Sequence, residues 1–366
     1  MKRTPARLTP GGFFFVRGRC IFPLMRIDIR SDTVTKPTAA MRRAMADAEV
    51  GDDVLDGDPT VKRLERRVAE LLGNEDALFF PSGTMANQTA VWLLSRPGTE
   101  VLLDAGSHIL HYEMAGAAAL AGAQVRPVTG SPVMDAEGLC AAVRPASPHV
   151  PAASLVCLEN THNGAGGRVT SLTDMRAIAD VARANKLPVH LDGARLWNAA
   201  VASGESLASL ASVADTVMVS FSKGLGCPVG AALAGRGDVI RDAWSVRKRL
   251  GGGMRQSGIL AAAVLHALDA HLGRIGDDHE TAKLYASLVD GVAGARVVPP
   301  DTNIVMLDLP PTLNAFSVVS EAARHDVLLT PWSASRIRAV THLDVGEKEI
   351  RAAARVMTEA LERAAR

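Results

Sequence analysis

The segment between residues 77 and 234 alternates short apolar runs with stretches that have a helical pattern. The apolar runs are hydrophobic at successive positions rather than at every second one, which is typical of strands buried on both faces. Strands of this type that alternate with helices form a mostly parallel sheet flanked by helices. The sequence therefore predicts an α/β fold. The expected strands lie at residues 77–80, 101–103, 125–127, 154–158, 189–191, 213–219 and 230–234.

The pattern changes beyond residue 275, and the change predicts a second domain. Short strands are expected at residues 296–298, 304–309, 327–329 and 336–340, with helices near 314–325 and over 347–365. We therefore expect a large domain over residues 25–275 and a smaller α+β domain over residues 276–366, with residues 25–48 as a segment that could pack on the smaller domain. Residues 1–24 are predicted to be a disordered extension, or the product of a start codon assigned too early, with Met25 as the working start.

The composition excludes several classes of partner. The formal net charge is +1 at pH 7, so the chain has no general field that would attract nucleic acid or an anionic membrane. No apolar run reaches the ~20 residues of a membrane-spanning helix. Because Cys20, Cys140, Cys157 and Cys227 form no C-x-x-C pair and no cluster with histidines, neither disulfides nor a structural zinc site is expected, and no residue is assigned as a metal ligand. This pattern favours the reducing cytoplasm.

Two of the predicted strands end in side chains of opposite charge. One leads through Ser220 to Lys223, which is followed by glycines, and another leads to Asp192. In open α/β sheets ligands bind at the carboxyl ends of the strands, so both side chains are expected in one site. An enzyme with pyridoxal phosphate needs such a pair: an amine that forms a Schiff base with the cofactor and a carboxylate that keeps the pyridine nitrogen protonated. Taken alone, Lys223 could also be a solvated lysine in a turn.

A third predicted strand ends in a turn suited to phosphate. After residues 77–80 the sequence reads P-S-G-T and continues as a helix through Leu94. The free backbone N–H groups of Gly83 and Thr84 would bind an anion at the start of this helix, where the helix dipole favours negative charge. Ser220 lies three residues before Lys223 and is a further candidate for the phosphate.

Several short segments, in the same order along the chain, match a known family. They are R-S-D-T-V-T-K-P-T (30–38), E-V-G-D-D-V (49–54), P-S-G-T-M (81–85), S-H-I (107–109), E-N-T-H-N (159–163), H-L-D-G-A-R (190–195), S-K-G-L (222–225), G-G-G-M-R-Q (251–256) and V-T-H (340–342). From about Met25 to the C-terminus the chain resembles the threonine aldolases of the low-specificity L type. These are fold-type-I pyridoxal phosphate enzymes, and the resemblance implies their fold for this chain.

The resemblance implies roles around the cofactor. Lys223 would carry the Schiff base, Asp192 would pair with the pyridine nitrogen, and His108 would stack on the cofactor ring. Arg255 would reach the phosphate in the site of the partner subunit, although it could also be a solvated arginine in a glycine-rich loop. The resemblance also places Arg195 among the residues that contact the cofactor.

Other residues would bind the substrate. Ser31, Arg195 and Arg338 correspond to the family's carboxylate-binding residues, and an arginine fork suits bidentate capture of a carboxylate. Tyr112 lies one helical turn after His108, so both could face one pocket, although core packing explains Tyr112 nearly as well. His149 corresponds to a family histidine near the substrate hydroxyl, but its local motif matches poorly.

The resemblance implies a lyase that cleaves L-threonine, L-allo-threonine and related β-hydroxy-α-amino acids to glycine and an aldehyde. The alternatives are a phenylserine-type aldolase, another fold-type-I lyase that catalyses β-elimination, and a cofactor-binding protein without activity. The intact lysine, aspartate and arginine set argues against the last. The resemblance also implies a homo-oligomer, a dimer with shared active sites that assembles into a homotetramer.

One segment departs from the family. Where threonine aldolases read G-D-D-V-Y-G-x-D-P, this chain reads G-D-D-V-L-D-G-D-P, so that Leu55 stands where a tyrosine is expected. In the family that tyrosine edges the active site of the neighbouring subunit. We therefore expect a wider and less polar pocket that favours bulky substrates such as phenylserine, unless the altered loop brings in another side chain.

Overall fold

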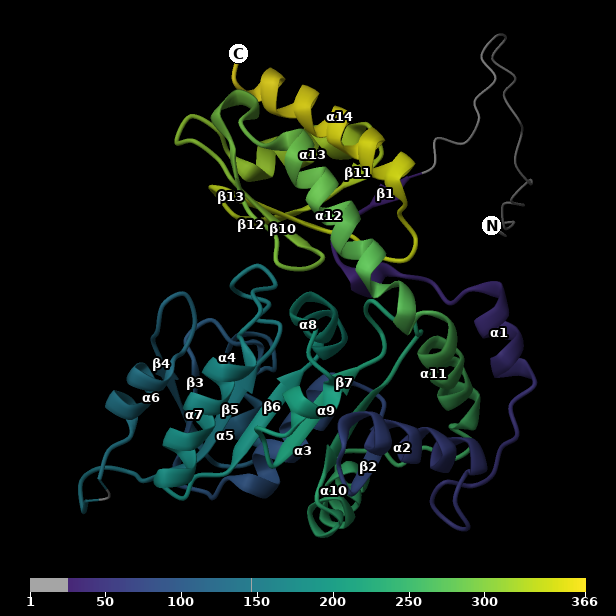
Figure 1. Cartoon of the computed structure of the whole chain (residues 1–366), viewed down its shortest axis with the longest axis vertical. Helices are drawn as coiled ribbons and strands as arrows, with labels where there is room; N and C mark the ends of the chain where they lie inside the picture. Colours follow the sequence, from purple (N-terminus) through teal and green to yellow (C-terminus); the bar gives the residue numbers. More distant parts are fainter. Residues whose placement is uncertain (1–25, 146) are drawn as a thin grey trace, which may run out of the picture.

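The computed structural model describes residues 26–145 and 147–366 (Figure 1). The predicted extension over residues 1–24 lies outside the described residues. A seven-stranded sheet with its helices forms one part of the molecule, and a smaller sheet with the C-terminal helices forms the other. The two parts have separate hydrophobic clusters, and this supports the predicted division near residue 275, which stays a prediction.

The large sheet has the strand order β2-β8-β7-β6-β5-β3-β4. Strand β8 runs antiparallel to both of its neighbours, β2 and β7. The other six strands run in one direction, so their carboxyl ends lie at the same edge of the sheet. This confirms the predicted α/β fold with a mostly parallel sheet. The strands are β2 (Asp76–Phe80), β3 (Glu100–Asp104), β4 (Gln124–Val128), β5 (Ala153–Glu159), β6 (Val189–Gly193), β7 (Thr216–Ser220) and β8 (Ala231–Gly235).

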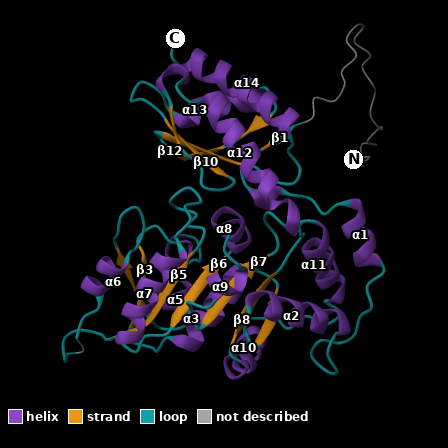
Figure 2. Cartoon of the chain, in the orientation of Figure 1, coloured by secondary structure: helices purple, strands orange, loops and turns teal. Residues whose placement is uncertain are grey.

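Helices cover both faces of this sheet (Figure 2). Val217 and Val219 of β7 belong to a buried cluster with residues of α2 and α7, whereas Met218 between them packs with residues of α3 and α10. Alternate side chains of one strand therefore point to opposite faces, as the continuous apolar pattern predicts. The helices are α1 (Ala39–Ala46), α2 (Pro59–Leu72), α3 (Gly83–Leu94), α4 (His108–His111), α5 (Gly116–Ala119), α6 (Ala136–Ala142), α7 (Leu172–Ala184), α8 (Leu196–Ser203), α9 (Leu207–Ala211), α10 (Gly237–Arg249) and α11 (Gly258–Ala270).

The C-terminal part contains a four-stranded antiparallel sheet of order β12-β13-β10-β9. The strand predicted at residues 327–329 corresponds to β11, which pairs with the N-terminal β1, and β12, which was not predicted, follows it and joins the antiparallel sheet. The elements are β1 (Ile27–Asp28), η1 (Asp32–Val34), η2 (Leu272–Arg274), α12 (Ile275–Val289), η3 (Val292–Gly294), β9 (Arg296–Val298), β10 (Ile304–Asp308), α13 (Ala315–Arg324), β11 (Val327–Leu328), β12 (Thr330–Ser333), β13 (Arg336–Val340) and α14 (Glu347–Ala364).

The segment over residues 25–48 divides between the two parts. Ile27 pairs with Val327 in β11, and Ile29 is buried in the C-terminal hydrophobic cluster. Helix α1, in contrast, lies beside α11, and its Met41 is buried in the cluster of the large sheet (Figure 1). Only the start of the segment therefore packs on the C-terminal part, and α1 belongs with the large one.

The two outer strands of the large sheet, β2 and β4, differ in how their outward backbone groups are occupied. On β2 the Phe79 N–H donates to Glu65 Oε1 at 2.9 Å, and Arg247 Nη1 donates to the Phe79 carbonyl at 2.6 Å. Arg247 is buried and also donates to Asp53 Oδ2 at 2.9 Å. At the other edge, β4 contains Pro127, which has no N–H to offer. Side chains from α2 and α10 thus satisfy the outward backbone groups of Phe79.

Among the described residues, no single helix combines the length and apolar character needed to cross a membrane. One bent pair, Gly258–Ala270 with Leu272–Val289, meets the criteria by length and composition only. The cysteines Cys140, Cys157 and Cys227 are free.

Candidate active site

A cavity of about 220 Å³ opens between the carboxyl edge of the large sheet and the C-terminal part. It brings together six of the residues predicted from the sequence, from five separate segments of the chain. The three further lining residues are Thr33, Asn163 in the segment that follows β5, and Trp332 on β12. The full lining is Ser31, Thr33, His108, Tyr112, Asn163, Arg195, Lys223, Trp332 and Arg338.

Lys223 follows β7 and faces this cavity. Burial lowers the pKa of its amine to about 8, and the nearby positive charge of Arg195 acts in the same direction. A neutral amine is the nucleophilic form. The site therefore holds a lysine whose neutral form is available close to neutral pH.

Asp192 lies one residue before the end of β6, beside β7, and is fully buried. Its Oδ2 accepts from Asn87 Nδ2 at 2.9 Å and its Oδ1 accepts from the Ala194 N–H at 3.1 Å. Asn87 is itself held, because its Oδ1 lies 3.0 Å from His190 Nε2. These contacts fix the carboxylate before any ligand binds.

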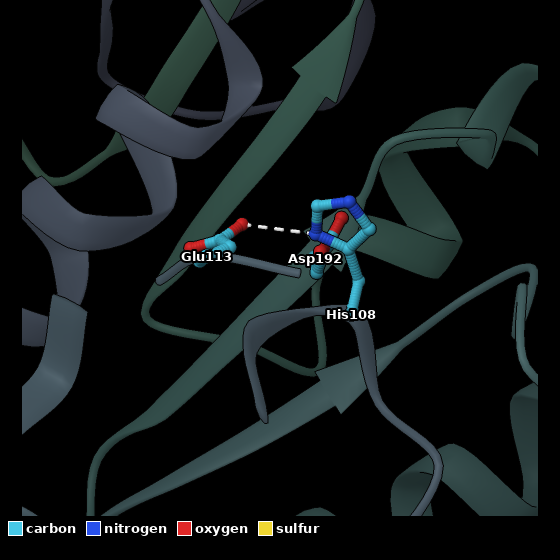
Figure 3. A group of neighbouring side chains, drawn as sticks. All are labelled: His108, Glu113 and Asp192. Carbon is cyan, nitrogen blue, oxygen red and sulfur yellow. Dashed lines mark hydrogen bonds and ion pairs between the residues drawn. The ribbon is translucent and has the colours of Figure 1, made fainter. Parts of the chain in front are cut away.

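His108 and Glu113 lie beside Asp192 (Figure 3). His108 Nδ1 lies 3.1 Å from Glu113 Oε1, and the same oxygen accepts from Asn87 Nδ2 at 2.8 Å. Burial opposes a charge on the imidazole, but the hydrogen bond to Glu113 and the charge of Asp192 raise the pKa of His108 above its usual value. Glu113 therefore orients the ring and stabilises its protonated form.

His108, Glu113 and Asp192 each offer one possible metal ligand within 4.8 Å of one another. Asn87 Nδ2 donates to both carboxylates, however, so an amide donor already lies between them. This arrangement suits orientation of His108 and Asp192 better than a cation. The sequence-based expectation of no metal stays a prediction.

Arg195 and Arg338, which also line the cavity, form a candidate anion site. Asp32 holds Arg195 through two bonds of 2.7 Å, from Nε and Nη2, and Arg195 Nη1 donates to Asn163 Oδ1 at 3.3 Å. Arg338 Nη1 donates to the same oxygen at 3.1 Å, while its buried Nε has no partner among the described residues. Burial and the charge of Arg195 lower the pKa of Arg338 to about 10. Two guanidiniums with an unpartnered donor can bind a carboxylate, and that role stays a prediction.

The predicted phosphate residues lie at the same edge of the sheet. Gly83 begins α3 directly after β2, and a Cβ added there would approach Met218 Cε to 3.3 Å, so only glycine fits without displacement. Ser82 Oγ accepts from the Met85 N–H, which leaves the N–H groups of Gly83 and Thr84 without a partner among the described residues. Ser220 is the last residue of β7 and is buried. These groups can hold a phosphate, and that role stays a prediction.

Two predicted residues lie elsewhere. His149 is exposed in the turn before β5, and the site forms at the other end of that strand, at Glu159, so His149 does not reach this cavity within the chain. Arg255 is half-exposed and pairs with Asp52 at 3.0 Å, away from the cavity lining. Its contact with the phosphate in a partner subunit's site stays a prediction.

Several residues of the site were not predicted from the sequence. Glu113 follows His108 by five residues in an irregular stretch, and its place is set by Asn87 and Gln88 of α3. Glu159, at the end of β5, accepts from the backbone N–H groups of His108 and Asn163 at 2.7 and 2.8 Å. Asp32, the partner of Arg195, lies inside a matched segment and could have been found there. Trp332 lies on β12, which was not predicted as a separate strand.

The residues present fit pyridoxal phosphate. A lysine whose neutral form is accessible, a buried fixed carboxylate, an imidazole beside it and free helical N–H groups lie at one edge of the sheet. These are the protein groups that this cofactor requires.

Comparisons with known proteins agree with this geometry. A profile of the beta-eliminating lyase family matches residues 28–311, and the chain belongs to this family. The chain is 41% identical to low-specificity L-threonine aldolase 1 of Arabidopsis thaliana, with 88% of this chain and 93% of that protein covered. It is 39% identical to low specificity L-threonine aldolase of Escherichia coli O157:H7, with coverage of 88% and 96%. Within its family the chain is therefore a member of the low-specificity L-threonine aldolase group.

A solved structure of threonine aldolase from Leishmania major has the same fold. Its TM-score is 0.78 at 21% sequence identity, with 92% of this chain and 99% of that chain covered. The fold-type-I architecture predicted from the sequence is thereby confirmed.

Proposed function

We propose that the chain catalyses retro-aldol cleavage of L-threonine, L-allo-threonine and related β-hydroxy-α-amino acids to glycine and an aldehyde, with pyridoxal phosphate as its cofactor. The observation that carries the proposal is that Lys223 and Arg338 line one cavity. An amino acid can place its amine near Lys223 and its carboxylate on Arg338 at the same time. The relatives named above act on threonine by their names, and this supports the same substrate here.

When bound, the cofactor accepts the electron pair released by the broken Cα–Cβ bond. The chain's residues prepare this step. Asp192, which Asn87 and Ala194 hold in place, would keep the pyridine nitrogen protonated. Arg338 would fix the substrate carboxylate and so set which bond of Cα stands perpendicular to the ring.

The hydroxyl proton of the substrate needs an acceptor. Because His108 Nδ1 is hydrogen-bonded to Glu113, His108 Nε2 is the ring nitrogen that would accept this proton. The nearby carboxylates would stabilise the imidazolium that forms. His108 is therefore the proposed base, and His149, which lies outside the cavity of this chain, is not needed for the step.

A product assay tests the proposal. Purified protein loaded with pyridoxal phosphate should release acetaldehyde and glycine from L-threonine in equal amounts. Ammonia and a keto acid would instead indicate β-elimination, the alternative that the family description favours. Release of neither pair of products would contradict both.

We further propose a cytoplasmic homo-oligomer, a dimer with shared active sites that assembles into a tetramer. Arg255 and Leu55 support sharing, because both are exposed on neighbouring loops: the Asp53 N–H donates to the Arg255 carbonyl at 3.1 Å, and Leu55 is 74% exposed. If Arg255 acts in the partner's site, inactive Lys223→Ala subunits mixed with Arg255→Ala subunits should regain activity. Light scattering would give the number of subunits.

A further inference from the structure

Two aromatic rings line one side of the cavity, and none of the roles assigned above uses Trp332. Its ring centroid lies 6.4 Å from that of Tyr112, with 46° between the planes, and Tyr112 lies 5.4 Å from His108. Both distances fall in the range of favourable aromatic pairs. The rings therefore form a continuous wall, the aromatic wall (Tyr112 and Trp332), which begins beside His108.

The far end of the aromatic wall meets the anion site. The guanidinium carbon of Arg338 lies 4.7 Å from the centre of the Trp332 ring, a cation–π contact. Trp332 also packs against a small buried cluster of Ile304, Met306 and Val340. The indole is thus supported from the C-terminal sheet while it also lines the cavity.

The remainder of the cavity is polar. Apart from the two rings of the aromatic wall and the imidazole of His108, every lining residue carries a hydroxyl, an amide or a charge. An apolar group on a bound ligand can therefore avoid polar surface only along the aromatic wall. Such contact is favourable because it removes apolar area from water.

The placement of a substrate follows from these surfaces. With its carboxylate on Arg338 and its amine at Lys223, a β-hydroxy amino acid has one large group left, the substituent on its β-carbon. We infer that Trp332 determines specificity, and that its indole, together with Tyr112, packs against an aromatic or large apolar β-substituent. This inference rests on the proposed retro-aldol function and adds the preferred substrate class.

The test compares two substrates in the loaded enzyme. The kcat/KM values for L-threo-phenylserine and L-threonine are measured by release of benzaldehyde and acetaldehyde in the wild type, Trp332→Leu and Trp332→Phe. We expect the phenylserine-to-threonine ratio to fall about tenfold in Trp332→Leu. Trp332→Phe, which keeps a ring, should retain most of the ratio. Trp92→Leu is the matched control, because Trp92 also lies under an arginine, Arg249, at 5.1 Å but outside the cavity.

A binding measurement separates recognition from turnover. L-Phenylalanine and L-alanine share the amine and carboxylate but have no hydroxyl to lose, and calorimetry on the loaded enzyme gives their dissociation constants. Trp332→Leu should raise the dissociation constant of L-phenylalanine more than that of L-alanine, by a factor similar to the fall in the kcat/KM ratio.

The outcomes distinguish the inference from the function beneath it. Suppose that threonine is cleaved, but that in Trp332→Leu neither the phenylserine-to-threonine ratio of kcat/KM nor the ratio of the phenylalanine and alanine dissociation constants changes by more than about twofold. The specificity role of Trp332 is then wrong. An equal rise in KM for both substrates would also overturn it, since Trp332 would then only support Arg338. If the wild type releases aldehyde from neither substrate, the proposed function fails and this inference with it. Should Trp332→Leu not fold, an unchanged phenylserine-to-threonine ratio of kcat/KM in Tyr112→Leu would overturn the inference.

Discussion

The two sides of the active-site cavity differ in how their polar groups are satisfied. On the side of the large sheet, Asp192, Glu113 and Asn87 are buried and bonded to one another. On the C-terminal side, Arg338 keeps a buried Nε without a partner among the described residues, and Trp332 is partly exposed. The first side is organised before a ligand arrives, as catalysis by fixed charges requires. The second is completed by the ligand, so changes there should affect binding more than chemistry.

The largest effect is expected on the sheet side, at Lys223. Lys223→Ala should lower turnover by at least about a thousandfold, because the nucleophilic amine is lost. The near-visible absorbance of the bound cofactor should disappear after dialysis. Lys348→Ala, a change at an exposed lysine of α14, is the control and should leave both unchanged. Absorbance retained by the dialysed Lys223→Ala protein would place the cofactor on another lysine.

On the C-terminal side, Arg338→Lys should raise the KM for threonine by about tenfold to a hundredfold, since a lost charge-assisted pair costs about 1.5–3 kcal/mol. Cofactor content and kcat should change little. Arg336→Lys is the matched control, because Arg336 lies on the same strand but pairs with Asp308 at 2.8 Å. A variant at Arg338 that lost cofactor while keeping its KM would reverse the comparison between the two sides.

A smaller and pH-dependent effect is expected at Glu113. Glu113→Gln removes the negative charge that raises the pKa of His108, so that pKa should fall. If His108 must be neutral to accept the hydroxyl proton, the acid limb of kcat/KM will move to lower pH. The new amide can be accommodated, because Gln88 Oε1 has no partner among the described residues and can accept a hydrogen bond once Gln88 rotates.

The His108–Glu113 pair also makes the stability of the fold depend on pH, in a direction that the raised pKa of His108 determines. Because the folded-state pKa of His108 is raised above the usual 6.5, its contribution to stability is fully present below that pH and is lost as pH rises through the raised pKa. Glu113→Gln should flatten this dependence in denaturant unfolding measured across the range. NMR titration of the His108 ring in wild type and variant gives the shift directly, and an unchanged pKa would show that Glu113 does not act on the imidazole.

The smallest effect is expected at Leu55, which lies outside the cavity of its own chain and is 74% exposed. If this loop edges a neighbouring subunit's site, Leu55→Tyr should lower the phenylserine-to-threonine ratio of kcat/KM by on the order of threefold. A ratio that stays constant would mean that the loop does not set substrate size.

The sequence predicted the sheet side better than the C-terminal side. Lys223, Asp192 and Gly83 follow apolar strands directly, so one local pattern reveals both the strand and the residue at its end. Glu113 escaped prediction because its burial depends on α3, which lies more than twenty residues earlier in the chain. Trp332 escaped because β12 exists only through its pairing with β13. His149 was expected in the site from alignment of a motif, yet the direction of β5 carries it to the opposite edge.

The two outer strands of the large sheet have a consequence for how copies of this chain can associate. The unpaired N–H and C=O groups of an exposed strand edge can pair with a strand from another molecule, in orderly assembly or in aggregation. At β2, Glu65 and Arg247 already occupy the outward N–H and carbonyl of Phe79, and at β4 Pro127 interrupts the donors of the ladder. These features disfavour extension of the large sheet by simple strand addition at Phe79 and at Pro127. If copies of this chain associate, we expect them to meet through surfaces other than these two strand edges, so that the sheet geometry that places Lys223 and Asp192 would not depend on assembly.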